Sequence, residues 1–369
     1  MPVESERTTR RAALIASGAV LGTAQDGGEE ALHFGDWKRE WAAVREGVGV
    51  FDGGFRKLWA LVGTDRVSFL QGMITADVAR LGNGTGTYAA SVTVQGRVVT
   101  DLRVFALEDA LWLDVPRERA DRVREHLSQY IVADDVEFAD PPSVPLIVLE
   151  GRRAASLAQR WLGEDVAELP MYGHREIVWN GLNVRVAAVT HTGERGWILF
   201  GSPAGFAHLW QEACALGALP VGAQALEVLR IEAGIPRVGV DMDESTLIAE
   251  ADVEAAISYG KGCYLGQEVV ERVAARGQVQ RKRRGFICRG SALPVRGAGV
   301  FQHQREVGHV TSVAWSPALG CGIGFAYLRR EVWEPGQILE ARWAEDRASI
   351  EVANVPFLEL PVKLRGTAQ

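Results

Sequence analysis

Hydrophobic and polar positions follow the same order of patterns in two successive stretches of this chain. In the first stretch, short apolar runs bounded by turn residues predict strands at 55–63, 87–94, 97–107 and 111–115. Two of these runs flank Gln95-Gly96, a pair typical of a tight turn, so we expect them to form a strand pair. Helical spacing of apolar residues predicts one helix that begins near Thr64-Asp65 and a second that begins at Pro116.

The second stretch begins after Asp140-Pro141-Pro142, a sequence that breaks both helices and central strands. The order of patterns then repeats, with strands and helices expected at 144–149, 152–162, 176–189, 196–200 and 203–217. The two stretches share their order of elements and not their sequence. We therefore predict an α+β fold with two lobes of similar, ferredoxin-like construction.

The pattern of apolar and polar residues changes from about residue 280, where short alternating strands are separated by glycine and proline. This pattern predicts a small antiparallel β-barrel. The predicted domains are an N-terminal extension at 1–30, a first lobe at 31–140, a second lobe at 141–279 and the barrel at 280–369. A chain of 369 residues is long enough to hold several such cores.

Composition narrows the classes of protein that fit. Hydrophobic residues make up 47% and charged residues 24%, values ordinary for a globular enzyme. The net charge of -7 argues against a protein that coats nucleic acid. No apolar stripe is left over for an interface, so we expect a monomer.

Localisation is predicted from the cysteines and from the N-terminal segment. The four cysteines show no two-residue spacing and are too few for a disulfide framework, so we expect a reducing, cytoplasmic setting. Arg10-Arg11 precede the apolar run 12–22 and imitate a signal peptide, but Ser17 and Gly18 break that run. No apolar run is long enough for a membrane span.

Several common catalytic motifs are absent from the sequence. It contains no phosphate-binding Walker loop, no dinucleotide fingerprint, no HExxH and no GxSxG. The seven histidines show no ligand spacing, so we expect no metal site. Nucleophilic hydrolysis and metallohydrolysis are therefore poorly supported.

The segment 260–268 (GKGCYLGQE) is the most informative part of the chain. It places Cys263 between glycine-rich turns and next to Lys261, and a neighbouring cation favours the reactive thiolate. Gln267 and Glu268 follow four and five residues later. The alternative is a glycine-rich turn in which Cys263 is a small buried hydrophobic residue.

Two acidic residues occur where a carboxylate needs an explanation. Asp101 lies among apolar residues in a predicted strand, so it is either exposed or recognises a polar ligand. Glu194 lies in a glycine-flanked loop before a strand, which is either an ordinary hairpin or a site where a carboxylate accepts paired N–H bonds from a heterocycle.

Two groups of basic residues also leave alternatives open. Arg230 lies on a predicted helix that ends at Gly234, where it either pairs with Glu227 or Glu250 or clamps a ligand carboxylate. The run 281–284 (RKRR) is either a solvated face or an anion-binding patch.

Taken together, five segments resemble the folate-binding superfamily of the glycine-cleavage T protein and its YgfZ-type relatives, the iron–sulfur assembly factors. They are WKREWAAVREGVGVFD (37–52), VGTDRVSFLQGMITADV (62–78), HTGERGW (191–197), LRIEAGIPRVGVDM (229–242) and GHVTSVAWSPALGCGIGFAYL (308–328). The resemblance covers residues 30–365 or so. The segment KGCYLGQE is similar to the signature of the YgfZ-type branch, whereas the acid at Asp101 resembles the T protein.

The resemblance implies a two-lobed region that binds tetrahydrofolate in a central channel, followed by a barrel. Asp101 matches the acid that faces the folate, Glu194 the acid that binds the pterin, and Arg230 the arginine near the folate tail. Cys263 matches the family cysteine, with Lys261, Gln267 and Glu268 around it. The implied partners are folate and, transiently, iron–sulfur proteins or their assembly factors.

Three hypotheses of function follow from this resemblance. The first is an accessory factor for assembly or repair of iron–sulfur clusters, including those of tRNA-modifying enzymes, in which Cys263 acts as a transient ligand or contact. The second is a folate-dependent aminomethyl- or methyltransferase, in which Asp101 orients the substrate amine and the folate. The third is a binding module that uses the fold without folate.

Overall fold

A five-stranded antiparallel sheet forms the centre of the first lobe in the computed structural model, which describes residues 2–276, 279–290 and 292–362. Its strand order is β5 (Gly86–Val92), β6 (Val98–Ala106), β7 (Leu111–Pro116), β4 (Arg56–Val62) and β8 (Glu137–Ala139). The predicted pairing about Gln95-Gly96 is confirmed, and Gly96 adopts a φ of +71°, which glycine tolerates at no steric cost. The predicted strands 55–63 and 111–115 match β4 and β7.

Helices α3 (Arg66–Met73) and α4 (Ala120–Ser128) cover the outer face of this sheet. Leu70 of α3 and Val123 of α4 are fully buried against Leu102 and Leu113 of the sheet. The period-two alternation of the strands and the helical spacing of these apolar residues together produce this core.

The second sheet has six strands. Its order is β10 (His174–Trp179), β11 (Leu182–Val189), β12 (Gly196–Gly201), β9 (Val144–Glu150), β3 (Gly49–Asp52) and β13 (Leu219–Val221). Helices α1 (Pro2–Ala16), α5 (Ala154–Leu162) and α7 (Phe206–Ala215) pack on its outer face, next to the short α6 (Glu164–Ala167).

Two predicted boundaries of the first lobe are wrong. Strand β3 comes from the stretch assigned to the first lobe, yet it pairs with β9 and β13 of the second sheet, because Val50 and Phe51 bury their side chains there. Residues 1–30 are not an appended extension. In α1, Leu14 is buried in the core of the second sheet, and the hydroxyl of Ser17 accepts a hydrogen bond from Trp210 Nε1 at 2.9 Å.

After α1, the ribbon of β1 (Val20–Thr23) and β2 (Glu29–His33) leads into α2 (Trp37–Glu46). Helix α2 begins at Asp36, whose side chain caps the backbone N–H of Lys38. Among the helices in the described part of the chain, none combines the length and the apolar character needed to cross a membrane.

The inner faces of the two sheets pack against each other. Leu58, Phe105 and Trp112 from the first sheet meet Ile198 and Phe200 from the second in one apolar layer. Helix α8 (Ala223–Glu232) contributes Leu229 to this layer and lies between it and the barrel. A polar cavity opens where this apolar layer ends.

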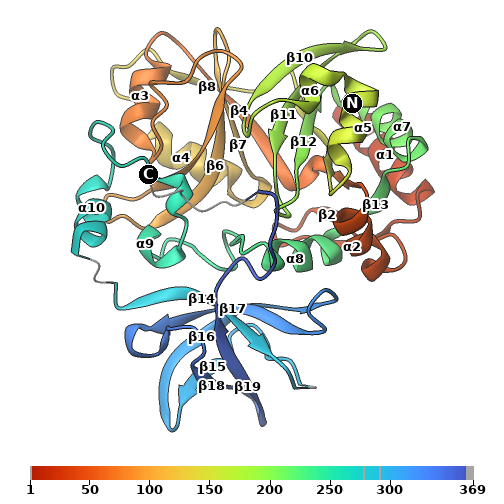
Figure 1. The fold of residues 1–369 in the computed structure, drawn as a ribbon. Coiled ribbons are helices and arrows are strands. Elements are labelled where there is room, and N and C mark those ends of the chain that lie inside the picture. Colours follow the sequence, from red (N-terminus) through yellow and green to blue (C-terminus); the bar gives the residue numbers. More distant parts are fainter. Residues whose placement is uncertain (1, 277–278, 291, 363–369) are drawn as a thin grey trace.

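The C-terminal barrel confirms the prediction made from the alternating strands. Its order is β14 (Arg281–Cys288), β17 (Cys321–Arg329), β16 (Arg305–Ser316), β15 (Gly299–Gln302), β18 (Ile338–Trp343) and β19 (Asp346–Ala353), and β19 pairs with β14 to close it. Figure 1 shows the barrel in blue beside the two sheets. Helices α9 (Ile248–Ala251) and α10 (Gln267–Arg276) precede the barrel in the sequence, and they pack against β5 and β6 of the first sheet although this stretch was predicted to belong to the second lobe.

Candidate functional site

A cavity of about 900 Å³, including its open mouth, lies between the two sheets and α8. Its lining comes from the polar ends of both inner faces: Phe55, Arg56, Tyr88, Asp101 and Arg103 from the first sheet, with Tyr172, Thr190 and His191 from the second. Helix α8 and the loop after it supply the roof, which includes Leu226, Arg230 and Arg237.

Strand register gathers the polar residues of the floor on one face of the first sheet. Asp101 and Arg103 are two residues apart on β6, so their side chains point to the same side. Arg103 pairs with Tyr88 on β5 and with Asp114 on β7. Tyr88 donates from its hydroxyl to Asp101 Oδ2 at 2.9 Å, which fixes one side of the carboxylate.

Asp114 holds two arginines of the floor in place. Its fully buried carboxylate accepts from Arg56 Nε at 2.9 Å and from Arg103 Nη1 at 2.8 Å, and its carbonyl oxygen accepts from Arg56 Nη2 at 2.8 Å. The two guanidinium groups are nearly as buried, with side-chain exposures of 7% and 8%. One buried carboxylate thus fixes the positions of two cations.

His191 links the same floor to the second sheet. Its Nδ1 lies 2.6 Å from Glu150 Oε1, and its Nε2 lies 2.9 Å from Arg103 Nη1. Glu150 also accepts from the backbone N–H of His191 and from the hydroxyl of Thr192. Burial, together with the charges of Arg103 and Arg56, lowers the pKa of His191 well below its usual value.

The titration of Asp101 is set by opposing influences. Burial raises the pKa of its carboxyl group, while Arg56 and the hydrogen bond from Tyr88 lower it, and the net direction is upward. Burial also raises the pKa of Tyr172 to about 12, so this phenol stays neutral at physiological pH. Asp101 is therefore a half-buried carboxyl group poised in a polar cavity rather than an exposed surface acid.

Aromatic rings form the walls of the cavity. The rings of Tyr88 and Tyr172 lie 6.4 Å apart and nearly parallel, at 18°. Tyr172 adopts a φ of +62°, a conformation that costs a bulky residue on the order of 1–3 kcal/mol. The surrounding structure compensates for this cost and holds the ring at the cavity wall.

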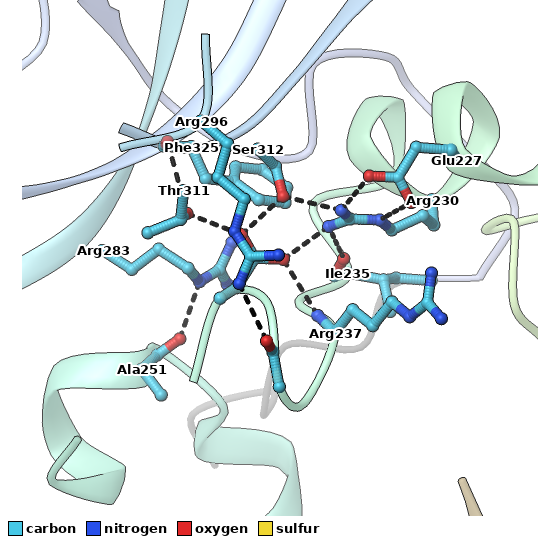
Figure 2. A network of polar contacts seen from close by, with 12 residues as sticks. Glu227, Arg230, Ile235, Arg237, Ala251, Arg283, Arg296, Thr311, Ser312 and Phe325 are labelled. Carbon is cyan, nitrogen blue, oxygen red and sulfur yellow. Dashed lines mark hydrogen bonds and ion pairs between the residues drawn. The ribbon is translucent and has the colours of Figure 1, made fainter. Parts of the chain in front are cut away.

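Arg230 lies at the edge of the cavity, but its donors are already used (Figure 2). It donates to Glu227, to Asp241 at 2.6 Å, to the carbonyl oxygen of Ile235 and to Ser312 Oγ at 2.6 Å. The predicted pairing with Glu227 is present, whereas Glu250 pairs with Arg281. All five N–H groups have protein partners, so the structure does not support a ligand clamp by this arginine.

The structure places Glu194 outside the lining of the cavity. Its carboxylate pairs with Arg45 Nη1 at 3.1 Å, and Arg45 also pairs with the buried Glu232 at 2.8 Å. Ser316 of the barrel donates to the same Glu232 at 2.6 Å. This network ties α2, α8 and the barrel together, and it draws Glu194 away from the expected pterin contact.

Lys261 has different partners from those expected. Its ammonium group donates to the carbonyl oxygens of Gln71, Ile74 and Ala76 at 2.6–2.7 Å, which uses all three N–H groups. Burial lowers its pKa to about 8. The expectation that Lys261 favours a thiolate at Cys263 thus lacks a geometric basis, because the lysine points into the protein while Cys263 is exposed.

Gln267 and Glu268 are likewise not part of the cavity lining. Gln267 accepts from the backbone N–H of Tyr264 at 3.2 Å, and Glu268 pairs with Arg272 one turn along α10. Neither contact points to a ligand.

In the basic run 281–284, Arg283 is buried and donates to the carbonyl oxygen of Ala251 at 2.8 Å, so this run is neither a solvated face nor an open anion patch.

Sequence reasoning missed most of the cavity lining, including Arg56, Tyr88, Arg103 and His191. A signal for Arg103 was present, because it follows Asp101 by two residues on the same predicted strand. No local pattern marks Arg56 or His191, which reach the site only through sheet pairing. Within the described ranges, no three His, Cys, Asp or Glu side chains converge on a position suitable for a metal ion.

Comparison with known proteins accounts for nearly the whole chain. The GCVT N-terminal domain family matches residues 11–261, and the glycine cleavage T-protein C-terminal barrel domain family matches residues 281–359. An aminomethyltransferase of Rubrobacter xylanophilus is 32% identical over 307 residues, which cover 83% of this chain and 82% of that protein. An aminomethyltransferase of a Nostoc species is 28% identical, over 91% of each chain.

The fold also matches a solved structure. The crystal structure of the glycine cleavage system aminomethyltransferase T from Bartonella henselae superposes with a TM-score of 0.86, covering 96% of this chain and 98% of that chain at 22% identity. At this identity the likeness establishes the shared fold. The two family matches, with the relative that is 32% identical over 83% of the chain, show that this chain belongs to the glycine cleavage T-protein family.

Proposed function

We propose that the chain is a folate-dependent aminomethyl- or methyltransferase, which moves a one-carbon group from an amine donor to tetrahydrofolate in the central cavity. The observation that carries this proposal is Asp101, a carboxyl group held by Tyr88 at 2.9 Å inside a cavity between the two sheets. Two relatives that match this chain over most of their length are named aminomethyltransferases, and these names support the same reaction class.

The residues of the cavity fit tetrahydrofolate. Tyr172, Tyr88 and Phe55 offer apolar ring faces for a pterin and an aminobenzoyl group. Arg237 lines the cavity and pairs with Glu118 at a long 3.5 Å, and its remaining N–H groups offer a cation for the carboxylate end of a folate. When bound, tetrahydrofolate supplies the nucleophilic nitrogen that accepts the one-carbon group.

Asp101 would act by position and charge. One carboxylate oxygen accepts from Tyr88, which leaves the other to accept an N–H of the donor amine or of the folate. Because the group is fixed before the substrates bind, it stabilises positive charge that develops on nitrogen without reorganising. Removal of such a group typically costs about 10²–10⁴ in rate.

The test is turnover of tetrahydrofolate with an aminomethylated carrier and with N-methyl donors. Asp101→Asn should lower kcat about 10²-fold or more, while Cys263→Ser and the exposed control Asp109→Asn keep the wild-type rate. Full activity of Asp101→Asn, or loss of activity in Cys263→Ser alone, would contradict the transferase proposal.

A second candidate is an accessory role in assembly or repair of iron–sulfur clusters, and one observation favours it. Cys263 is exposed in a loop that Lys261 anchors through three carbonyl oxygens, so a thiol is presented on a fixed segment. One cysteine cannot fill the ligand positions of a cluster, so a partner protein or a small thiol would supply the others.

Complementation separates this candidate from the first. In a strain that lacks the protein, Cys263→Ser should fail to restore the activity of cluster-dependent enzymes, including tRNA-modifying ones, while Asp101→Asn restores it. Full restoration by Cys263→Ser would remove the accessory role.

A further inference from the structure

The two arginines on the cavity floor keep N–H groups without protein partners. Arg56 Nη1 and Arg103 Nε have no hydrogen-bond acceptor among the residues that the structure describes, although both side chains are more than nine-tenths buried and line the cavity. Neither N–H donor is sealed from solvent, so an anionic ligand that enters the cavity can accept hydrogen bonds from both.

The shape of these donors favours a carboxylate. Asp114 holds both guanidinium groups from one side, and the charge of Asp101 acts on the same pair. Planar guanidinium edges match the two oxygens of a carboxylate in distance and direction. His191 holds Arg103 from the opposite side, at 2.9 Å, so this edge is fixed before a ligand arrives.

Asp101 lies next to this cationic pair and offers the complementary group. It is two residues from Arg103 on the same face of β6, a spacing of about 7 Å along the strand. Its Oδ2 accepts from Tyr88, and its Oδ1 has no donor among the described residues. The floor therefore offers two kinds of contact within the length of one small molecule. Arg56 and Arg103 offer N–H donors to an anion, and Asp101 offers a carboxylate to an amine.

We propose that this floor is a subsite for a zwitterionic donor: a small free N-methyl amino acid whose carboxylate binds Arg56 and Arg103 and whose nitrogen faces Asp101. In the transfer, the bond between this nitrogen and the methyl carbon would break as the carbon bonds to a folate nitrogen. The proton of that folate nitrogen would pass to the released amine, so no oxidant is required. The proposal rests on the transferase function above and narrows its substrate class. An aminomethyl group on a carrier protein has no carboxylate beside its nitrogen and would leave both arginines unpaired.

The test is calorimetric titration with N-methylglycine, N-methylglycinamide and methylamine, at saturating and at zero tetrahydrofolate. The wild type should bind N-methylglycine at least tenfold more tightly than the amide or the amine, because only the acid pairs with the arginines. Equal affinity for the acid and the amide overturns the proposal without any variant being needed.

Variants of the cavity arginines test where the carboxylate of N-methylglycine binds. Arg103→Gln should weaken N-methylglycine about tenfold or more and leave the affinity for tetrahydrofolate unchanged, while Arg160→Gln on the outer helix α5 changes neither. Asp114 keeps Arg56 as a partner in Arg103→Gln, so the fold should persist, which circular dichroism checks.

Two further outcomes are distinguishable. If Arg103→Gln weakens tetrahydrofolate but not 6-methyltetrahydropterin, which lacks the glutamyl group, the arginines bind the folate tail and the proposal is wrong. If N-methylglycine binds but tetrahydrofolate does not, the subsite stands and the transferase proposal fails.

Discussion

Arg103 Nη1 lies 2.9 Å from Nε2 of His191, and this contact determines the state of the imidazole. An arginine N–H can only donate, so Nε2 must carry the lone pair that accepts it. The proton of the neutral ring is then on Nδ1, where it faces Glu150 at 2.6 Å. His191 is therefore a neutral positioning residue that links Glu150 to the cationic floor of the cavity.

The protonation state of His191 is directly measurable. We expect the Nδ1–H tautomer, with no uptake of a second proton near pH 6.5, because burial and the neighbouring arginines lower the pKa of this ring well below that value. Nitrogen-15 chemical shifts of the histidine rings, with His191→Gln for assignment, provide the measurement. A ring that titrates near 6.5 or carries its proton on Nε2 would contradict the proposed network.

Asp101→Asn should stabilise the protein at neutral pH while it removes activity. Burial raises the pKa of Asp101 in the folded state above its value in the unfolded chain. Between these two pKa values the native state binds more protons than the unfolded chain. The free energy of unfolding therefore falls as pH rises through this range. The amide removes this unfavourable contribution. Urea denaturation should give a higher free energy of unfolding for Asp101→Asn at pH 7 than for the wild type.

The same experiment at lower pH provides its own control. The advantage of Asp101→Asn should shrink as pH falls through the raised pKa, because the wild-type carboxyl group then takes up its proton. The exposed Asp109→Asn should show no such dependence. A variant that is less stable than the wild type by the same amount at every pH would indicate that the hydrogen bond from Tyr88 outweighs burial.

His174 should make the protein sensitive to acid. Burial and Arg185 lower its pKa to about 4, so its contribution to stability is complete above pH 6.5 and is lost as pH falls toward 4. A shift of this size corresponds to on the order of 3 kcal/mol. His174→Gln should flatten the dependence of unfolding free energy on pH by about this amount, and the exposed His208→Gln should leave it unchanged.

Arg230 offers a matched comparison between a buried and a half-exposed partner. Asp241 is fully buried, accepts from Arg230, Thr311 and Ser312 at 2.6 Å, and joins α8 to the barrel, whereas the side chain of Glu227 is 35% exposed. Asp241→Asn should cost roughly 3–5 kcal/mol of unfolding free energy, and Glu227→Gln about 1 kcal/mol or less. Equal costs would show that burial does not govern this network.

The elements of the fold were predictable wherever periodicity is local. Strands β5 and β6 lie close to their predicted ranges, and the barrel predicted from the alternating pattern after residue 280 is present. Strand β3 was assigned to the wrong lobe, because four residues carry no information about the sheet that they join. The packing of the N-terminal segment was not predictable from its own residues, because its partners, including Trp210, lie far along the chain.

The site was predictable only in part, for the same reason. The structure places Asp101 in the cavity, but it gives Arg230, Glu194 and Lys261 protein partners in place of the expected ligand or thiol. Charged residues in this chain satisfy one another across elements that are distant in sequence. The arginines with unpaired donors therefore appear only after the strands are in register.

Calorimetric titration with tetrahydrofolate tests most directly whether the cavity binds folate. The wild type should bind one equivalent, Tyr172→Ala at the cavity wall should bind at least about tenfold more weakly, and the exposed Tyr259→Ala should bind like the wild type. Absence of binding to the folded wild type, or equal affinity in Tyr172→Ala, would contradict a folate-dependent transferase that uses this cavity.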